Sequence, residues 1–583
     1  MLSNYVRKMK ALRMEMGKNF LCLFGVLLTA RITLQASSST SPYYVGAAVE
    51  YHPVTKGNNG TAIVEENLKN YLKILKRAND HEVDIIVFPE GTLHSTKAKL
   101  DLPPADFRAA FLPHSSFVPD PKDHVTPCKN DSSNVMQALK AISCTAKLYA
   151  MYVVVNVHEK ETCANEKIPK ERCNPDGHML YNTNVVFDRH GEVIARYRKY
   201  NLFGEVGFNR PPNAELSTFR TDFDVTFGQF ICFDILFGNP TLRLISEAKV
   251  TDIVFSTYWF SELPFLVATP VQSAWSYMNN VNLIASGYNN PTSGSSGSGV
   301  YAGLEGPIVK LLSDKRANAL LVSKIPKLVN GRRDYRPTPA DSTTYFFTKN
   351  EIPTIDGPEP VPQLSMLKDN LTPYKTELIP NTNGTLSRVL CDRGLCCQFS
   401  TDTTHHNSVG QKNSKYFRYR YAVFNGVRSF ATVISGGVEV CGIISCTDDT
   451  PASCNRRFDP NDIIVHPITF NSILISGDFT TTGQNVSRMP IAMNTDFQPL
   501  NASDIELKTE SINQTHENLK FSLKKSRTGI MTFAIWERVF SRDGSPTTTS
   551  SASQSSPFVF MLVILVIFGV SNTDAVNPLP IVA

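Results

Sequence analysis

The stretch Gly228-Gln-Phe-Ile-Cys-Phe-Asp-Ile-Leu-Phe237 decides how the fold of this chain is interpreted. Its apolar residues predict a buried strand over 225–232, followed by a helix over 241–248. A strand that bends towards a helix exposes the side chain at the bend and turns the next backbone N–H groups towards a bound oxygen atom. Cys232 stands at this bend, which predicts a nucleophilic thiol. Taken alone, the residue is equally consistent with a core cysteine or with half of a disulfide.

Two other polar residues follow expected strands. Glu90 comes after a buried strand at 83–88, in Phe88-Pro-Glu-Gly91, where side chains of α/β proteins reach the site crevice and a sheltered carboxylate suits a general base. Lys199 closes a hairpin strand, in Arg196-Tyr-Arg-Lys-Tyr-Asn-Leu-Phe203, where an ammonium group stabilises a developing oxyanion. The plain alternatives are a charged turn residue for Glu90 and a solvated basic face for Lys199.

The region 43–330 alternates strands with helices. Apolar runs predict the strands, and apolar residues at a period of 3.6 predict the helix 64–78. Gly191 in Arg189-His-Gly191 suits the turn of a hairpin between 184–188 and 192–198. The order predicts helices packed on sheets, an α/β domain. The further expected strands are 43–50, 152–158, 252–256 and 281–286, and the further expected helices are 134–148 and 270–280.

Proline-rich stretches at 337–339 and 353–362 mark the next domain boundary. Beyond them, alternating apolar and polar residues predict a smaller, mostly β domain over 340–540. Its expected strands are 416–424, 432–435, 438–444, 462–465 and 529–536.

Both ends of the chain carry apolar runs. Basic residues before the run 20–30 and a serine-rich stretch after it predict a signal peptide over 1–36; an uncleaved anchor and a later start methionine are alternatives. A polar spacer and the run 558–570 predict a GPI-attachment signal within 543–583. The polar stretch 571–578 departs from that pattern, so secretion without an anchor and a short membrane span stay open. The attachment residue also stays open.

Seven Asn-X-Ser/Thr triplets agree with a secretory route and a glycosylated surface. Their asparagines are Asn59, Asn130, Asn370, Asn383, Asn485, Asn501 and Asn513.

The chain has twelve cysteines. With Cys22 in the signal peptide and Cys232 free, ten remain, an even number that an oxidising compartment pairs as disulfides. We expect adjacent Cys396 and Cys397 to bridge to other partners. The rival interpretation is a zinc site, but no Cys-x-x-Cys pairs recur at finger spacing, so no metal is predicted.

Composition limits the classes of function. The 583 residues are too many for one core and predict two or three domains, and 42% hydrophobic with 19% charged residues are typical of a folded protein. A net charge of +5, with no long basic run, argues against nucleic acid as a partner.

Together, Phe88-Pro-Glu-Gly91, Tyr197-Arg-Lys-Tyr-Asn-Leu-Phe203 and Ile231-Cys-Phe-Asp-Ile-Leu-Phe237 resemble the three motifs of the nitrilase superfamily, and its vanin and biotinidase branch in particular. The resemblance covers 43 to about 327, and 340–540 resembles the vanin base domain loosely. It implies an α-β-β-α sandwich with Glu90 as base, Lys199 as electrostatic stabiliser and Cys232 as nucleophile. It implies no metal and no organic cofactor.

The resemblance also implies the reaction. Cys232 attacks a small secondary amide, pantetheine-like or biocytin-like, to form a thioester, with the Phe233 N–H and Lys199 holding the oxyanion. Glu205 matches a second glutamate near the lysine and has either a substrate-binding or an orienting role. Tyr258, Trp259 and Tyr288 are candidates for lining the pocket, although such residues are more often core. These last assignments follow from the resemblance and not from residue spacing.

Two other functions stay open at this stage. One is an inactive surface protein of the same fold that acts in binding or adhesion, and the other is acyl transfer to a nucleophile other than water. The predicted setting is extracellular, on the cell membrane through the anchor or secreted, with a small-molecule amide as partner. The sequence leaves the substrate, the disulfide pairing and the oligomeric state open.

Overall fold

The computed structural model describes residues 37–548, apart from 58, 95–102, 130–133, 164–167, 354–363, 407–413 and 482–484. The predicted signal peptide, the apolar tail from 549 onwards and the Asn130 glycosylation site lie outside the described residues. In the described part, no helix combines the length and the apolar character that crossing a bilayer requires.

Two sheets form the centre of the first domain. The first has seven strands in the order β14-β13-β1-β2-β3-β4-β5, and the second has six in the order β12-β11-β10-β8-β7-β6. The first comprises β1 (Tyr43–Glu50), β2 (Ile85–Val87), β3 (Tyr152–Thr162), β4 (His178–Phe187), β5 (Val193–Arg198), β13 (Ala319–Pro326) and β14 (Ser342–Phe346). The second comprises β6 (Thr218–Arg220), β7 (Thr226–Ile231), β8 (Asp252–Thr257), β10 (Asn282–Gly287), β11 (Ser298–Ala302) and β12 (Pro307–Leu311).

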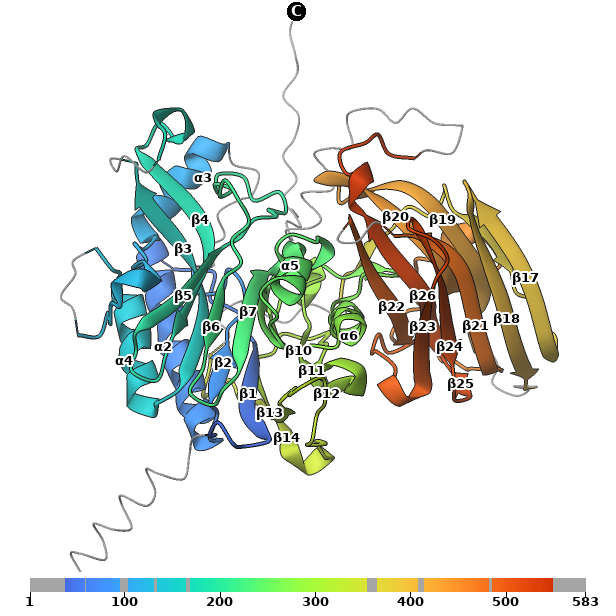
Figure 1. The fold of residues 1–583 in the computed structure, drawn as a ribbon, viewed down its shortest axis with the longest axis horizontal. Helices are drawn as coiled ribbons and strands as arrows, with labels where there is room; N and C mark the ends of the chain where they lie inside the picture. The colour runs from blue at the N-terminus through green and yellow to red at the C-terminus, as the bar shows by residue number, and fades with distance from the viewer. Residues whose placement is uncertain are drawn as a thin grey trace, which may run out of the picture.

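Helices cover the outer face of each sheet (Figure 1). α2 (Gly60–Asp80) and α4 (Gln137–Tyr149) pack on the first sheet, whereas α5 (Thr241–Ser246) and α6 (Ala268–Asn279) pack on the second. Side chains alternate as a strand requires: Ile85 and Val87 lie in the core between the sheets, and Ile86 in the core under α2 and α4. The predicted α-β-β-α sandwich is therefore confirmed.

The second domain is two packed sheets, which confirms the prediction of a mostly β domain. Their strand orders are β16-β19-β20-β26-β22 and β17-β18-β21-β24-β23, with β25 beside β21. The first comprises β16 (Lys375–Leu378), β19 (Arg418–Phe430), β20 (Ile434–Cys446), β22 (Val486–Asn494) and β26 (Ile530–Val539). The second comprises β17 (Gly384–Asp392), β18 (Leu395–His405), β21 (Ile468–Thr480), β23 (Ile505–Ser511), β24 (His516–Leu523) and β25 (Arg527–Thr528).

Some local predictions were wrong in this half of the chain. The strand predicted at 432–435 begins two residues later, at Ile434 of β20; residues 431–433 form the turn after β19, where Ala431 and Thr432 both adopt a left-handed backbone, with φ of 46° and 61°. Residues 462–465 form no strand; the Asp459 carboxylate accepts the Asn461 N–H at 2.9 Å and closes a turn there. β14, which lies inside the range predicted for the second domain, pairs with β13 of the first.

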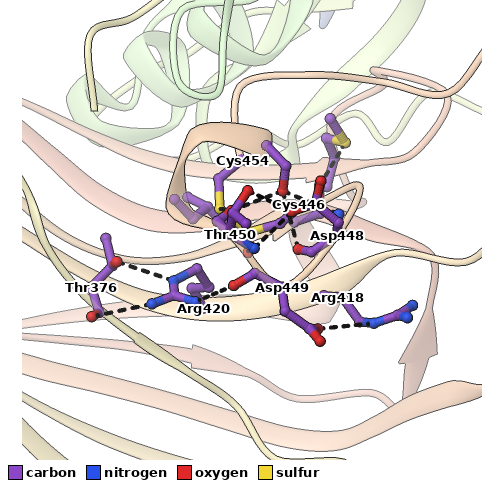
Figure 2. The surroundings of a disulfide bond; sticks show 12 residues. Thr376, Arg418, Arg420, Cys446, Asp448, Asp449, Thr450 and Cys454 are labelled. Carbon is purple, nitrogen blue, oxygen red and sulfur yellow. Dashed lines mark hydrogen bonds and ion pairs between the residues drawn. A yellow bond between two sulfur atoms is a disulfide. The ribbon is translucent and has the colours of Figure 1, made fainter. Parts of the chain in front are cut away.

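Five disulfides join the ten cysteines, and Cys232 is the free cysteine of the described residues. Cys396 and Cys397 bridge to different partners, as predicted. Figure 2 shows the Cys446–Cys454 bridge, which closes the loop after β20; Arg420 of β19 donates to the Asp449 carbonyl of that loop at 2.8 Å. The pairs are Cys128–Cys144, Cys163–Cys173, Cys391–Cys396, Cys397–Cys441 and Cys446–Cys454.

The predicted glycosylation sites lie at the surface wherever they are described. Asn59 is exposed although its side chain also caps α2, accepting the Ala62 N–H at 2.9 Å. Because a glycan needs an accessible amide, exposure is compatible with the prediction, which stays untested. The other exposed sites are Asn370, Asn383, Asn485, Asn501 and Asn513.

The two domains share one core. α6 lies between the second sheet and β22 (Figure 1), and one cluster of buried side chains runs from Trp275 of α6 to Trp536 of β26. Removing this apolar area from water stabilises the domain pair by about 25 cal/mol per Å² buried. The position of the second domain is therefore set by packing.

Acid should destabilise the first domain through His94. Burial lowers the pKa of His94 to about 3, whereas an unfolded histidine titrates near ~6.5. Below that pH the unfolded chain takes up a proton that the folded chain cannot, so the free energy of unfolding falls as the pH drops from 6.5 towards 3, by about 1.4 kcal/mol per pH unit. His94→Leu should lose less thermal stability than the wild type between pH 7 and pH 5, measured by melting. His190→Leu, at an exposed position, is the control; equal acid losses in all three proteins contradict the prediction.

Candidate active site

Cys232 lies at a sharp bend between β7 and the short 3-10 helix Cys232–Leu236. Its φ is 61°, a left-handed value that is rare for a residue with a side chain. Asp234 holds the bend in shape: its carboxylate accepts the Ile231 N–H at 3.0 Å and the Tyr197 hydroxyl at 2.8 Å. The bend predicted from the sequence is present, and backbone strain is concentrated at the proposed nucleophile.

Glu90 and Lys199 are in direct contact. The Lys199 ammonium donates to Glu90 Oε1 at 2.6 Å and to Glu205 Oε1 at 3.1 Å. Asn182 of β4 donates to the same two carboxylates, at 2.7 Å each. Lys199 and Glu90 are 2% and 4% exposed, so one buried cation is shared by two carboxylates. Glu205, for which the resemblance left two roles open, contacts the lysine.

The backbone of Tyr258, directly after β8, connects Glu90 with Cys232. Its N–H donates to Glu90 Oε2 at 2.8 Å, and its carbonyl oxygen lies 3.5 Å from Cys232 Sγ, within reach of the thiol hydrogen. Residues that are far apart in the sequence therefore converge: the carboxylate follows β2, the ammonium follows β5 and the sulfur follows β7.

The electrostatic surroundings favour a protonated resting thiol. Burial raises the pKa of the Cys232 thiol well above its usual value, the Glu90 carboxylate raises it further and Lys199 lowers it. Burial alone would lower the pKa of Lys199, but Glu205 and Glu90 raise it well above the usual value. Lys199 is therefore charged, and the thiol needs a base before it can attack.

A narrow apolar pocket opens onto the sulfur. Tyr258 and Trp259, both predicted to line it, do so, and Trp259 is fixed by donating from Nε1 to the Leu266 carbonyl at 2.9 Å. Phe233, whose N–H was predicted to hold the oxyanion, also lines it. Tyr288 does not line it; its ring stacks at 3.8 Å on that of Tyr258. The remaining lining residues are Phe203, Leu236, Phe260, Glu262, Leu266, Leu367, Phe430 and Ala431.

Sequence reasoning missed several of these residues. Asn182 lies in the middle of β4, where an amide among apolar residues carries no motif. Asp234 stands two residues after the cysteine, a spacing that was visible but not interpreted. Phe430 and Ala431 come from the second domain, about two hundred residues further along. In the part of the chain that the structure describes, no group of three or more His, Cys, Asp or Glu side chains is arranged to hold a metal ion.

Comparisons with known proteins match both domains of the chain. The carbon-nitrogen hydrolase family matches residues 47–279, and the vanin C-terminal domain matches 364–543. Vanin-like protein 2 of Drosophila melanogaster is 31% identical over 556 residues, 91% of this chain and 96% of that protein. A pantetheinase of Bos taurus is 28% identical, covering 84% of this chain and 86% of that protein, and a biotinidase of Takifugu rubripes is 28% identical, covering 75% and 86%. Among solved structures, an amidase from Nesterenkonia sp. aligns with a TM-score of 0.34 at 16% identity, covering 48% of this chain and 90% of that one.

The fold and these matches define a hydrolase of amide carbon–nitrogen bonds. Within that class, the similarity along nearly the whole chain and the second-domain match show that this chain belongs to the vanin family.

The thiol pKa should move in opposite directions in two variants. Lys199→Met removes the cation that lowers it, so alkylation of Cys232 by iodoacetamide should shift to higher pH. Glu90→Gln removes a carboxylate that raises it, so alkylation should shift to lower pH. Rates are measured by mass spectrometry against pH, with Lys324→Met, which removes a surface ion pair with Asp341, as the matched control. Shifts in the same direction would rule out this electrostatic description.

Proposed function

We propose that this protein is an extracellular amidase that hydrolyses a small secondary amide through a thioester on Cys232. The observation that carries the proposal is the position of Glu90, held by Lys199 on one oxygen and by the Tyr258 N–H on the other, beside the Cys232 thiol. A fixed carboxylate next to a protonated thiol is the arrangement that a general base requires.

In the first half-reaction, Glu90 takes the thiol proton as the sulfur attacks the carbonyl carbon. The carbonyl oxygen becomes an oxyanion, which the Lys199 ammonium and the Phe233 N–H stabilise. The carbon–nitrogen bond then breaks, Glu90 returns the proton to the leaving amine and the acyl group stays on the sulfur as a thioester. The proton that Glu90 takes from the thiol is thus passed to the leaving amine within this half-reaction.

In the second half-reaction, Glu90 removes a proton from water, which attacks the thioester carbonyl. The carbon–sulfur bond breaks, the acid leaves and the thiol is restored. Glu205 holds Lys199 throughout: its contacts to Lys199, Asn182 and the Phe203 N–H orient the ammonium and share its charge. Glu205 is therefore a positioning residue in this scheme.

The substrate class is a pantetheine-like or biocytin-like amide. The relatives named pantetheinase and biotinidase support this class. The mostly apolar lining around Cys232 also supports it, because a narrow apolar slot favours a slim, uncharged segment beside the scissile amide.

Purified protein should turn over pantetheine, biocytin or both, and Cys232→Ala should reduce turnover by at least about a thousandfold, as removing a nucleophile does elsewhere. Glu90→Gln should lower kcat by a similar factor. Intact-mass spectrometry, which detects a thioester on the protein, should show none accumulating on this variant. The matched control is Val389→Ala, at a 64% exposed position on β17.

Three outcomes would contradict the proposal. Equal turnover by wild type and Cys232→Ala rejects the nucleophile. No turnover of any amide, together with no labelling of Cys232 by a small electrophile, favours a binding protein of the same fold. Product bearing an added amine instead of the free acid favours acyl transfer.

We propose a location outside the cell, at the membrane through a GPI anchor. The five disulfides and the exposed Asn-X-Ser/Thr sites support an oxidising, secretory route. Expressed in animal cells, the protein should shrink on treatment with a peptide N-glycosidase and leave the cell surface on treatment with a phosphatidylinositol-specific phospholipase. Full retention after the phospholipase contradicts the anchor, and protein found in the medium before treatment favours plain secretion.

A further inference from the structure

The pocket at Cys232 is not built from the catalytic domain alone. Phe430 and Ala431, at the end of β19 and in the turn that follows, form part of its lining, beside Trp259 and Glu262 of the first domain. Phe430 is 3% exposed, and its ring lies edge-on, 6.0 Å from that of Phe233, the residue after the nucleophile. One wall of the reaction site therefore comes from the second domain.

Beyond that wall lies a second, wider cleft. With the open solvent at their mouths included, the two spaces measure about 400 Å³ and about 1460 Å³, and they share three lining residues, Glu262, Leu367 and Ala431. The wider cleft is more polar; its lining includes Lys368, Asn370, Ser429 and Thr432. An amide held at Cys232 can thus extend past Ala431 into a cleft that offers hydrogen-bonding groups.

A buried ion group fixes the wall. Arg428, two residues before Phe430 on β19, donates to the Glu262 carboxylate and, at 3.2 Å, to Asp369. All three residues are buried, and they come from β19, from β9 (Glu262–Leu263) and from the segment after β15 (Leu367–Lys368). A buried guanidinium paired with two carboxylates tolerates little displacement, because moving it leaves charge unpaired.

A second buried arginine contacts both the Phe430 ring and the short helix that begins at Cys232. Arg538 of β26 is fully buried; it donates to the Leu236 carbonyl at 3.2 Å, and its guanidinium lies 4.9 Å from the centre of the Phe430 ring. Leu236 belongs to the short helix that begins at Cys232. The Arg538 guanidinium therefore contacts both the wall of the pocket and the helix that follows the nucleophile.

We infer that the turn between β19 and β20 selects the substrate: Phe430 and Ala431 form the gate between the two clefts, and Arg428 positions that gate. The favoured substrate is an amide with a slim apolar segment beside the scissile bond and a polar, hydrogen-bonding group further along. The inference rests on the proposed function for its substrate class, whereas access to Cys232 tests the gate separately.

The test narrows the gate. Ala431 is half-buried and already adopts its left-handed backbone without glycine, so Ala431→Leu adds side-chain volume at the junction of the clefts. We expect KM for pantetheine or biocytin to rise about tenfold, with kcat within about twofold of wild type, since steric changes in a pocket act at this scale. Ala452→Leu, at an exposed position outside both clefts, is the matched control.

Alkylation of Cys232 keeps the test independent of turnover. Iodoacetamide is small enough to pass the gate, whereas a chloroacetamide with a long hydroxylated arm must occupy both clefts. Ala431→Leu should slow the long reagent about tenfold and leave iodoacetamide within about twofold. An unchanged ratio of the two rates overturns the inference, as does equal slowing of both reagents. If no amide is turned over at all, the proposed function fails while this ratio still decides the gate.

A double-mutant cycle tests the positioning role of Arg428. Arg428→Met should raise the same KM, and adding it to Ala431→Leu should raise KM by much less than the product of the two effects, because both act on one wall. Arg428→Lys should restore part of the loss. Fully multiplicative effects at unchanged melting temperature overturn the role. If Arg428→Met does not accumulate as folded protein, Glu262→Gln weakens the same contact and replaces it in the cycle.

Discussion

The site depends on a single buried cation between two carboxylates. Lys199 is 2% exposed and lies within 3.1 Å of both Glu90 and Glu205. A buried ammonium is stable only with charged partners, and two buried carboxylates this close are stable only around a cation. Burial and the Glu90 carboxylate raise the pKa of the Cys232 thiol, and Lys199 lowers it. The thiol is therefore protonated at rest, and Lys199 is charged because Glu205 and Glu90 raise its pKa well above the usual value.

This charge group requires the two-sheet architecture. Glu90 and Lys199 leave the first sheet after β2 and β5, and Cys232 leaves the second sheet after β7. The Asp234 carboxylate joins these two supports, because it holds the cysteine bend and also accepts hydrogen bonds from Tyr197 and from the Asn201 N–H at 2.9 Å. Sliding one sheet over the other would break the carboxylate–lysine–thiol group and the Asp234 bonds together. The packed core between the sheets thus sets catalytic distances as well as stability.

The sequence predicted those residues of the site that are marked by a short local motif. Glu90 and Cys232 each follow an apolar run, and Lys199 closes a hairpin strand, so in each case a few residues show both the strand and its end. Asn182 has no such signal, because its role depends on the carboxylates that the folded structure places beside it. The sequence of β4 alone does not show which residues those are. A strand was predicted from Thr432 onwards, whereas Thr432 lies in the turn, since two consecutive left-handed residues without glycine contradict local preference. Hydrogen bonds within the turn stabilise this conformation: the Thr432 N–H donates to the Ser429 hydroxyl at 3.0 Å, and the Val433 N–H donates to the Phe430 carbonyl at 2.9 Å.

The contacts of the two buried arginines indicate that the second domain is an integral part of the structure around the active site. A guanidinium as fully buried as that of Arg538 would be costly in an independent β domain, because its Leu236 acceptor and its Phe237 ring neighbour both lie in the catalytic domain. Separated from the first domain, it would keep the Asp543 carboxylate, the Gly437 carbonyl and the Phe430 ring but lose its Leu236 acceptor and its Phe237 neighbour. Arg428 would likewise keep Asp369 and lose Glu262. Because each arginine has part of its partners in the other domain, the domain interface and the substrate pocket form as one structure, and a change that loosens one must alter the other.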